Sequence, residues 1–127
     1  MRTISVAVIG VGYWGPNLIR NFTRIPQVKN IVACDLDKKR LRAIINLYPQ
    51  IRTSQNLDEV LKDKEITFVA IATPINTHYA LAKKALLAGK HVMVEKPLTK
   101  TVAQAEELLE IAQKKKRLLF AGHTFVY

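Results

Sequence analysis

The stretch VIGVGYWGPN, residues 8–17, places three glycines within six positions, directly after a run of β-branched residues. That run, residues 4–9, is apolar without alternation, which is typical of a strand buried on both faces. Gly10, Gly12 and Gly15 then form a GxGxxG turn. The stretch predicts a strand, a tight turn and a helix that follow one another without a linker.

The same alternation continues along the whole chain. Further apolar runs lie at residues 31–34, 66–72, 91–94 and 118–121. Helical spacing and start signals indicate helices at 38–48 after Asp37, from Asn56 with Glu59, at 77–88 before Gly89, and at 102–115 after Thr101 with Gln104. Strands that alternate with helices pair in parallel through right-handed crossovers. We therefore expect an α/β fold with a doubly wound, mostly parallel sheet and three α/β/α layers.

The glycine turn has the spacing of a dinucleotide-binding (Rossmann) site. In such a site Gly10 permits the tight turn, Gly12 lets the backbone approach a pyrophosphate, and Gly15 lets the helix lie close to the strand. The N–H groups at the start of the helix then face the anion. Asp35 ends the second strand, where a carboxylate accepts hydrogen bonds from the adenosine ribose. The alternative is an ordinary βα turn with Asp35 as a loop residue.

The carboxylate of Asp35 also bears on the choice of cofactor. It should repel a 2′-phosphate, so we expect NAD rather than NADP. Three cations, Lys38, Lys39 and Arg40, follow within five residues and could surround that phosphate, which keeps NADP open.

Two aromatic residues occupy the variable positions of the glycine turn. Tyr13 and Trp14 are large enough to cover a bound cofactor or to line a substrate cleft. Their alternative use is packing against the helix that follows. We include both among the candidate cofactor contacts.

A second polar segment, ATPINTH at residues 72–78, follows the strand at 66–72. Ligands bind at the carboxyl ends of strands in sheets of this kind, so Thr73, Pro74, Asn76 and His78 are candidate cofactor contacts. The alternative is that Asn76 and Thr77 only cap the next helix.

A third segment, VEKP at residues 94–97, ends the next strand. Glu95 and Lys96 place charges at the edge of the sheet, where burial without a use is costly. With Pro97 they complete the list of candidate site residues. For Lys96 the alternative is a lysine at a strand end that pairs with a surface acid.

In this order the motifs resemble the Gfo/Idh/MocA family, named after glucose-fructose oxidoreductase and inositol dehydrogenase. The resemblance runs from GVGYWG through CD, ATPINTH and GKHVMVEKPL to AGHTFVY, and so spans the chain. It implies that Lys96 lies beside the nicotinamide and the reacting carbinol, that Glu95 contacts the nicotinamide ribose, and that Pro97 shapes the turn. The YWGPN and GHTFVY variants look most like members that act on nucleotide sugars, such as UDP-N-acetylglucosamine 3-dehydrogenases.

The family resemblance also sets a limit on activity. Its members carry a second, larger domain that holds the substrate, supplies a histidine or other base and often forms the oligomer interface. Residues 1–127 correspond to the NAD(P)-binding domain alone, so we expect cofactor binding with little turnover of a sugar or nucleotide sugar. A non-catalytic, cofactor-sensing regulator is the alternative function. His123 could approach the cleft, but a lone histidine is more often structural.

Composition argues against several other classes of protein, of which a nucleic-acid-binding module is the third alternative. The net charge of +10 is spread over both halves of the chain, and no nucleic-acid recognition motif accompanies it. The single cysteine, Cys34, offers neither an internal disulfide nor a metal-binding spacing. No apolar run approaches the length of a membrane span. We expect a cytoplasmic protein without a metal, nucleic-acid partner or membrane partner, and with homo-oligomers possible.

Overall fold

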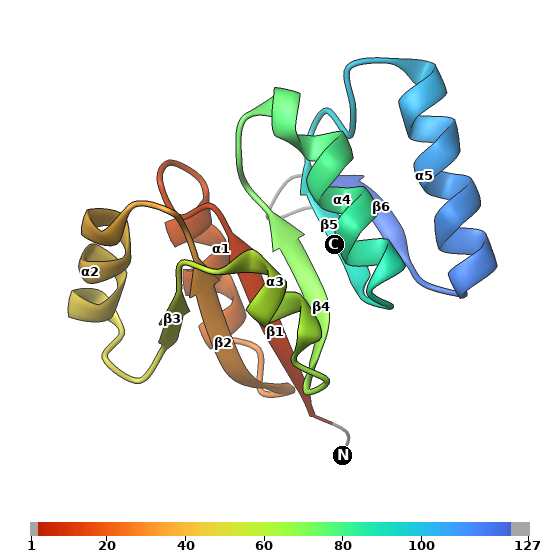
Figure 1. Ribbon diagram of the computed structural model, residues 1–127. Coiled ribbons are helices and arrows are strands. Elements are labelled where there is room, and N and C mark those ends of the chain that lie inside the picture. Colours follow the sequence, from red (N-terminus) through yellow and green to blue (C-terminus); the bar gives the residue numbers. More distant parts are fainter. Residues whose placement is uncertain (1–2, 123–127) are drawn as a thin grey trace.

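The computed structural model describes residues 3–122, so His123 and the segment after it lie outside the described residues. Strands and helices alternate along the chain (Figure 1). The elements are β1 (Ile4–Ile9), α1 (Gly15–Thr23), β2 (Val28–Cys34), α2 (Lys38–Leu47), β3 (Arg52–Ser54), α3 (Leu57–Lys62), β4 (Ile66–Ile71), the 3₁₀ turn η1 (Ile75–Thr77), α4 (His78–Leu87), β5 (His91–Glu95), α5 (Val102–Lys115) and β6 (Leu119–Gly122). The predicted α/β alternation is confirmed.

The strands form one sheet in the order β3-β2-β1-β4-β5-β6. Every neighbouring pair is parallel, so the carboxyl ends of the strands meet at one edge. The chain builds outward from β1 to β3 and then crosses to β4 on the other side of β1 (Figure 1). This reversal between β1 and β4 confirms the doubly wound sheet. It also places a crevice above β1 and β4, where such folds bind ligands.

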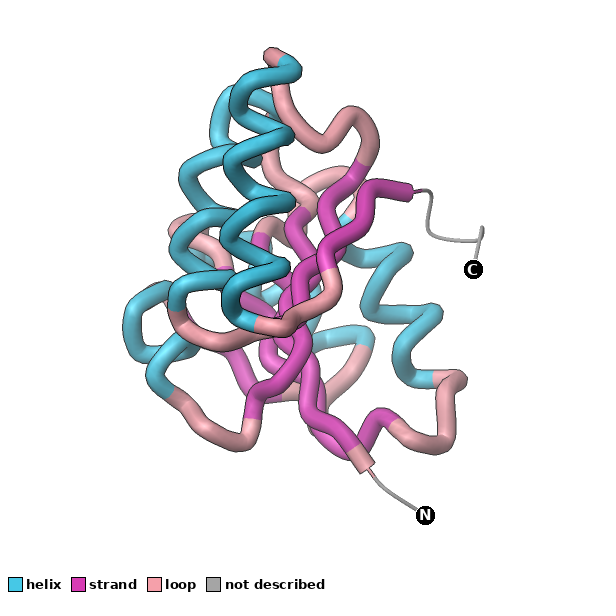
Figure 2. Tube along the Cα trace, turned by 90° about the vertical axis from the view of Figure 1, so that its right-hand side faces the viewer, coloured by secondary structure: helices cyan, strands magenta, loops and turns pink. Residues whose placement is uncertain are grey.

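Two apolar clusters hold the helices on opposite faces of the sheet, and the edge-on view shows helices on both sides (Figure 2). Helices α3, α4 and α5 pack on one face through buried residues that include Val60, Leu86 and Leu108. Helices α1 and α2 pack on the other face through Leu18, Ile19, Leu41 and Ile44. The predicted three layers are therefore present. No helix in the described part of the chain is long and apolar enough to span a membrane.

The helix starts follow most of the predicted caps. Asp37 Oδ1 accepts a hydrogen bond from the Lys39 N–H at 2.8 Å, and Asn56 Oδ1 accepts one from the Glu59 N–H at 3.1 Å. Thr101 caps α5 in the same way, through the Gln104 N–H at 3.2 Å. Each cap satisfies a backbone donor that the helix itself leaves free.

The start of α4 differs from the capping alternative for Asn76 and Thr77. Thr77 occupies the N-cap position of α4 but makes no side-chain capping hydrogen bond. Its hydroxyl instead lies 2.6 Å from both Thr73 Oγ1 and the Pro74 carbonyl oxygen. Thr77 therefore stabilises the turn that leaves β4, and the interpretation of Thr77 as a simple cap is wrong.

Candidate functional site

Gly10 and Gly15 make the turn after β1 possible. Gly10 has φ +89°, a conformation that residues with a side chain rarely adopt, and a Cβ there would lie 2.7 Å from Thr73 Cγ2. A Cβ on Gly15 would lie only 2.0 Å from the Gly10 carbonyl oxygen. The first turn of α1 thus packs directly on the backbone that leaves β1. These are the geometric roles that the sequence predicts for both glycines.

Gly12 lies between them and presents bare backbone. The three atoms nearest to a Cβ at Gly12 would all belong to the guanidinium group of Arg40, with Nη1 at 2.8 Å, and that group ends a flexible side chain. The space in front of this backbone is therefore closed by a movable cation rather than by the fold. An anion can approach the Gly12 backbone once Arg40 moves aside.

Asp35 connects the glycine turn to the end of β2. Its Oδ2 atom accepts a hydrogen bond from the Val11 N–H at 2.9 Å, and its Oδ1 atom accepts one from the Asp37 N–H at 2.9 Å. The side chain is 9% exposed, and Arg40 Nη1 lies 3.8 Å from Oδ2. Two backbone donors therefore fix the carboxylate, while its remaining lone pairs can accept further hydrogen bonds.

A cleft of about 990 Å³ opens at the carboxyl ends of the strands. It is large enough for a sizeable organic ligand. Most of the cofactor contacts predicted from the sequence line it: Gly10, Gly12, Tyr13, Trp14, Asp35, Thr73, Pro74 and Asn76. The fold thus brings residues from the ends of β1, β2 and β4 to one surface.

Tyr13 and Trp14 project from the rim of this cleft. Tyr13 is 80% exposed and Trp14 is 46% exposed, and their rings meet edge to face with centroids 5.2 Å apart. This exposure does not fit packing of Tyr13 against the following helix. The pair presents aromatic surface to whatever enters the cleft.

The other predicted residues lie outside the lining of the cleft. Gly15 is buried under the turn, and His78 is 2% exposed. Glu95, Lys96 and Pro97 follow β5, which is the neighbour of β4. Because Ile71 pairs with Val94, the chain leaves both strands side by side, and the EKP turn lies next to the TPINTH segment. The Lys96–Pro97 peptide bond is cis.

The sequence reasoning missed several lining residues. These are Leu36, Gln55, Leu57, Ala80 and Leu81, together with Arg40 as a residue that faces the glycine turn. Gln55 follows β3, and its Nε2 atom donates to the Leu36 carbonyl at 2.9 Å. Predicting this side of the cleft requires knowing where β3 lies, and the three residues of β3 show no strand pattern in the sequence.

Cys34 forms part of the floor of the cleft. Burial raises the pKa of its thiol to about 11, and the negative charge of Asp35 adds to the effect. The thiol is therefore neutral near pH 7 and is a poor nucleophile. No group of acidic, histidine or cysteine side chains within residues 3–122 has the arrangement of a metal site.

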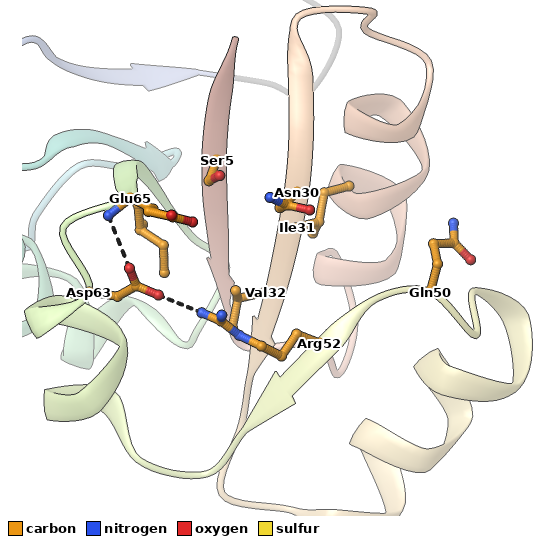
Figure 3. Close-up of a pocket in the computed structure, with 9 residues that line it drawn as sticks. Ser5, Asn30, Ile31, Val32, Gln50, Arg52, Asp63 and Glu65 are labelled. Carbon is orange, nitrogen blue, oxygen red and sulfur yellow. Dashed lines mark hydrogen bonds and ion pairs between the residues drawn. The ribbon is translucent and has the colours of Figure 1, made fainter.

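A second, smaller cavity of about 140 Å³ lies at the opposite end of the sheet (Figure 3). Arg52 reaches across it to Asp63, with Nη2 2.7 Å from Oδ2, and Asp63 Oδ1 accepts a hydrogen bond from the Glu65 N–H. These contacts join β3 to the loop before β4. Arg52 and Asp63 thus satisfy each other's hydrogen-bonding groups, and the pair links β3 to the loop before β4.

Comparison with known proteins identifies the family of the chain. The sequence model of an oxidoreductase family with an NAD-binding Rossmann fold, Gfo/Idh/MocA, matches residues 4–123. An uncharacterised oxidoreductase of Synechocystis, sll0816, is 34% identical over 112 residues, which is 88% of this chain and 30% of the relative. Glycosyl hydrolase family 109 protein 2 of Shewanella sp. ANA-3 is 31% identical over 126 residues, 92% of this chain and 28% of the relative.

The solved structures agree with the sequence relatives. GenD2 from gentamicin A biosynthesis, solved in complex with NAD, has a TM-score of 0.91 and 31% identity, and the match covers 96% of this chain and 35% of GenD2. Biliverdin reductase from Synechocystis, solved with biliverdin and NADP⁺, has a TM-score of 0.86 and 30% identity, and the match covers 94% of this chain and 38% of the reductase.

The length of these matches shows which part of the family's proteins this chain corresponds to. The chain spans 20% to 34% of the length of the curated relatives. The matched family region is the dinucleotide-binding domain, and the glycine turn, Asp35 and the cleft lie within it. The chain therefore belongs to the Gfo/Idh/MocA oxidoreductase family and carries its NAD-binding Rossmann domain.

Proposed function

We propose that this chain is the dinucleotide-binding part of an oxidoreductase that moves a hydride between a hydroxyl-bearing carbon of a sugar or nucleotide sugar and a nicotinamide. The observation that carries the proposal is the hydrogen bond from the Val11 N–H to Asp35. It joins the turn suited to a pyrophosphate to the acid suited to a ribose. Both lie on one cleft with bare backbone at Gly12, so these residues fit the cofactor.

Different residues of the cleft bind different parts of the dinucleotide. The backbone N–H groups of the glycine turn hold the pyrophosphate, because they are donors at the positive end of α1. Asp35 accepts hydrogen bonds from the adenosine ribose hydroxyls with the lone pairs that Val11 and Asp37 leave free. Tyr13 and Trp14 cover the bound molecule and limit its contact with water.

The EKP turn carries the proposed chemistry. A bound nicotinamide supplies the hydride acceptor or donor. The ammonium group of Lys96 orients the substrate hydroxyl and stabilises the negative charge that develops on its oxygen. Glu95 contacts the nicotinamide ribose, and Pro97 shapes the turn. The exposure of Lys96 leaves its ammonium group accessible to a substrate.

The nature of the substrate rests on the family rather than on this cleft. Among the similar structures is a myo-inositol 2-dehydrogenase from Lactobacillus plantarum, with 25% identity and a TM-score of 0.84. Its name supports a hydroxyl-bearing carbon as the reacting group. Because the chain spans about a third or less of its curated relatives, we propose that residues 1–127 bind cofactor but turn over little sugar on their own.

Titration of the isolated chain with NADH, followed by nicotinamide fluorescence, tests the proposal. We expect saturable binding, and we expect little NADH formation from NAD with glucose, myo-inositol or UDP-N-acetylglucosamine. If the chain binds neither NADH nor NADPH, the proposal of a dinucleotide site is contradicted. Rapid sugar-dependent NADH formation would contradict the expected lack of turnover.

We further propose that the site prefers NAD to NADP. The carboxylate of Asp35 is held in place by two N–H groups, so it cannot easily move away from a 2′-phosphate. The positive charge of Arg40 is not free to pair with a 2′-phosphate, because its guanidinium group already lies between Asp35 and Asp37, 3.8 and 3.7 Å from their carboxylates.

An Asp35→Asn substitution tests this preference. The amide keeps an oxygen that can accept from Val11 but removes the negative charge, so we expect the affinity for NADPH relative to NADH to rise about tenfold. Asp58→Asn is the matched control, because Asp58 is an exposed acid on α3 that pairs with Lys84 away from the cleft. Tighter binding of NADPH than NADH by the unchanged protein would refute the preference.

A further inference from the structure

His78 is buried between two backbone carbonyl groups from different parts of the site. Its Nδ1 atom lies 2.9 Å from the Pro97 oxygen, and its Nε2 atom lies 2.7 Å from the Thr73 oxygen. The residue is 2% exposed. Carbonyl oxygens only accept hydrogen bonds, so each ring nitrogen must donate to make its contact.

The two carbonyl groups belong to the two halves of the proposed site. Thr73 follows β4 and packs closely on the glycine turn, since a Cβ added to Gly10 would lie 2.7 Å from the Thr73 Cγ2 atom. Pro97 directly follows Lys96, and both residues are exposed. Lys96 and Pro97 therefore contribute little packing of their own to the EKP turn, although Leu98 packs on the core directly after them. His78 gives this turn a hydrogen bond from a buried ring at the start of α4.

We propose that His78 is a positioning residue that, through its hydrogen bond to Pro97, holds the EKP turn against the start of α4 and so beside the cleft. It thereby determines where the nicotinamide half of the dinucleotide binds relative to Lys96. The inference rests on the proposed function, because it assigns the nicotinamide end of the cofactor to the EKP turn. The ring itself stays buried and acts through the backbone, so it touches neither cofactor nor substrate.

Two substitutions separate the two contacts of the ring. The amide nitrogen of asparagine can take the place of Nδ1, and that of glutamine can take the place of Nε2. His78→Asn therefore keeps the donor to Pro97, whereas His78→Gln keeps the donor to Thr73. Each variant can donate to one of the two carbonyl groups only, so the two variants differ in which contact they keep.

The readout compares NADH with ADP-ribose, which has the same adenosine, pyrophosphate and second ribose but no nicotinamide. We expect His78→Gln to weaken NADH binding about tenfold, as loss of a buried hydrogen bond allows. Its affinity for ADP-ribose should stay within about twofold, because the glycine turn and Asp35 are unchanged. His78→Asn should bind both ligands within about twofold of the unchanged protein. A residue that only supports the fold would not change the ratio of the two affinities.

The outcomes distinguish this inference from the proposed function. If the unchanged chain binds neither ligand, the dinucleotide site itself is refuted. If it binds both, and His78→Gln weakens both equally or weakens neither, only the positioning role is refuted. Nitrogen NMR of the histidine ring in the unchanged protein gives a test that does not depend on a variant's folding. The Nδ1 atom must carry a hydrogen, and a bare Nδ1 would overturn the inference.

Discussion

At the scale of the residue, the glycines of the turn differ in how the fold would respond to a side chain. A Cβ on Gly15 would lie 2.0 Å from backbone, which cannot yield without moving α1 away from β1. We expect Gly15→Ala to lower the free energy of unfolding by about 3 kcal/mol. Urea unfolding followed by circular dichroism measures this change.

Gly12→Ala is the matched control for this substitution. The atoms nearest to its new methyl group belong to the flexible end of the Arg40 side chain, so the free energy of unfolding should change by less than about 1 kcal/mol. NADH binding should nevertheless weaken, because the methyl group occupies the space through which a pyrophosphate approaches the backbone. Equal losses of stability in both variants would show that the clash at Gly15 is relieved by a small shift.

The residue scale also shows which lining residues of the cleft can be predicted from the sequence. The place of Gly10, Gly12 and Asp35 in the cleft could be predicted because a dinucleotide imposes one spacing and one chemistry on a βα turn. Arg40 could be recognised as a nearby cation, but its place over Gly12 and between two acids depends on the path of α2. The contacts of His78 could not be predicted, because Pro97 lies 19 residues away and on another strand end.

At the scale of the element, α5 ends on a residue with an unfavourable backbone conformation. Lys116 has φ 57° and ψ 48°, the left-handed conformation that glycine adopts most easily. We expect Lys116→Gly to raise the free energy of unfolding by about 1 kcal/mol, since the left-handed form costs other residues roughly that much. The midpoint of thermal unfolding should rise by about 3–5 °C.

Lys115→Gly provides the comparison for this prediction. Lys115 lies in the last turn of α5 with helical geometry, where glycine costs about 1 kcal/mol. The two neighbouring substitutions should therefore change the unfolding midpoint in opposite directions. A lower midpoint in both variants would mean that the Lys116 side chain stabilises the end of the helix.

The elements also differ in how far the sequence alone defines them. Strands β1, β4 and β5 could be predicted because burial on both faces leaves unbroken apolar runs. The caps at Asp37, Asn56 and Thr101 could be predicted because each satisfies local donors. Strand β3 could not, because its three residues owe their conformation to pairing with β2 at the sheet edge. The residues after β3 that line the cleft were missed for the same reason.

At the scale of the whole molecule, Asp63 makes the stability of the fold depend on acid pH. A hydrogen bond from Arg52, and then one from the Glu65 N–H, hold the pKa of Asp63 below its usual value. Asp63 therefore contributes stability above the pKa of the unfolded chain, near 4, and that stability is lost as the pH falls through the lower folded pKa. Asp63→Asn should be less stable than the unchanged protein at pH 7, and the difference should shrink at pH 2.5.

Thermal unfolding midpoints at the two pH values measure this dependence. Arg52→Gln removes the same hydrogen bond from the other side of the small cavity (Figure 3). If the pair is the cause, the double variant should lose little more than either single variant. Additive losses would assign the pH dependence to other carboxylates.

The meeting of β1 and β4 has a further consequence for the sheet as a whole. Among the described strands, this one ladder joins the half β3-β2-β1 to the half β4-β5-β6. The cleft takes residues from both halves, Gly10 and Asp35 from one and Thr73 and Asn76 from the other. A ligand that contacts both halves of the sheet holds them together at the β1–β4 ladder. Its binding energy then opposes any local opening that parts β1 from β4, so cofactor supply would also govern how long the chain resists proteases.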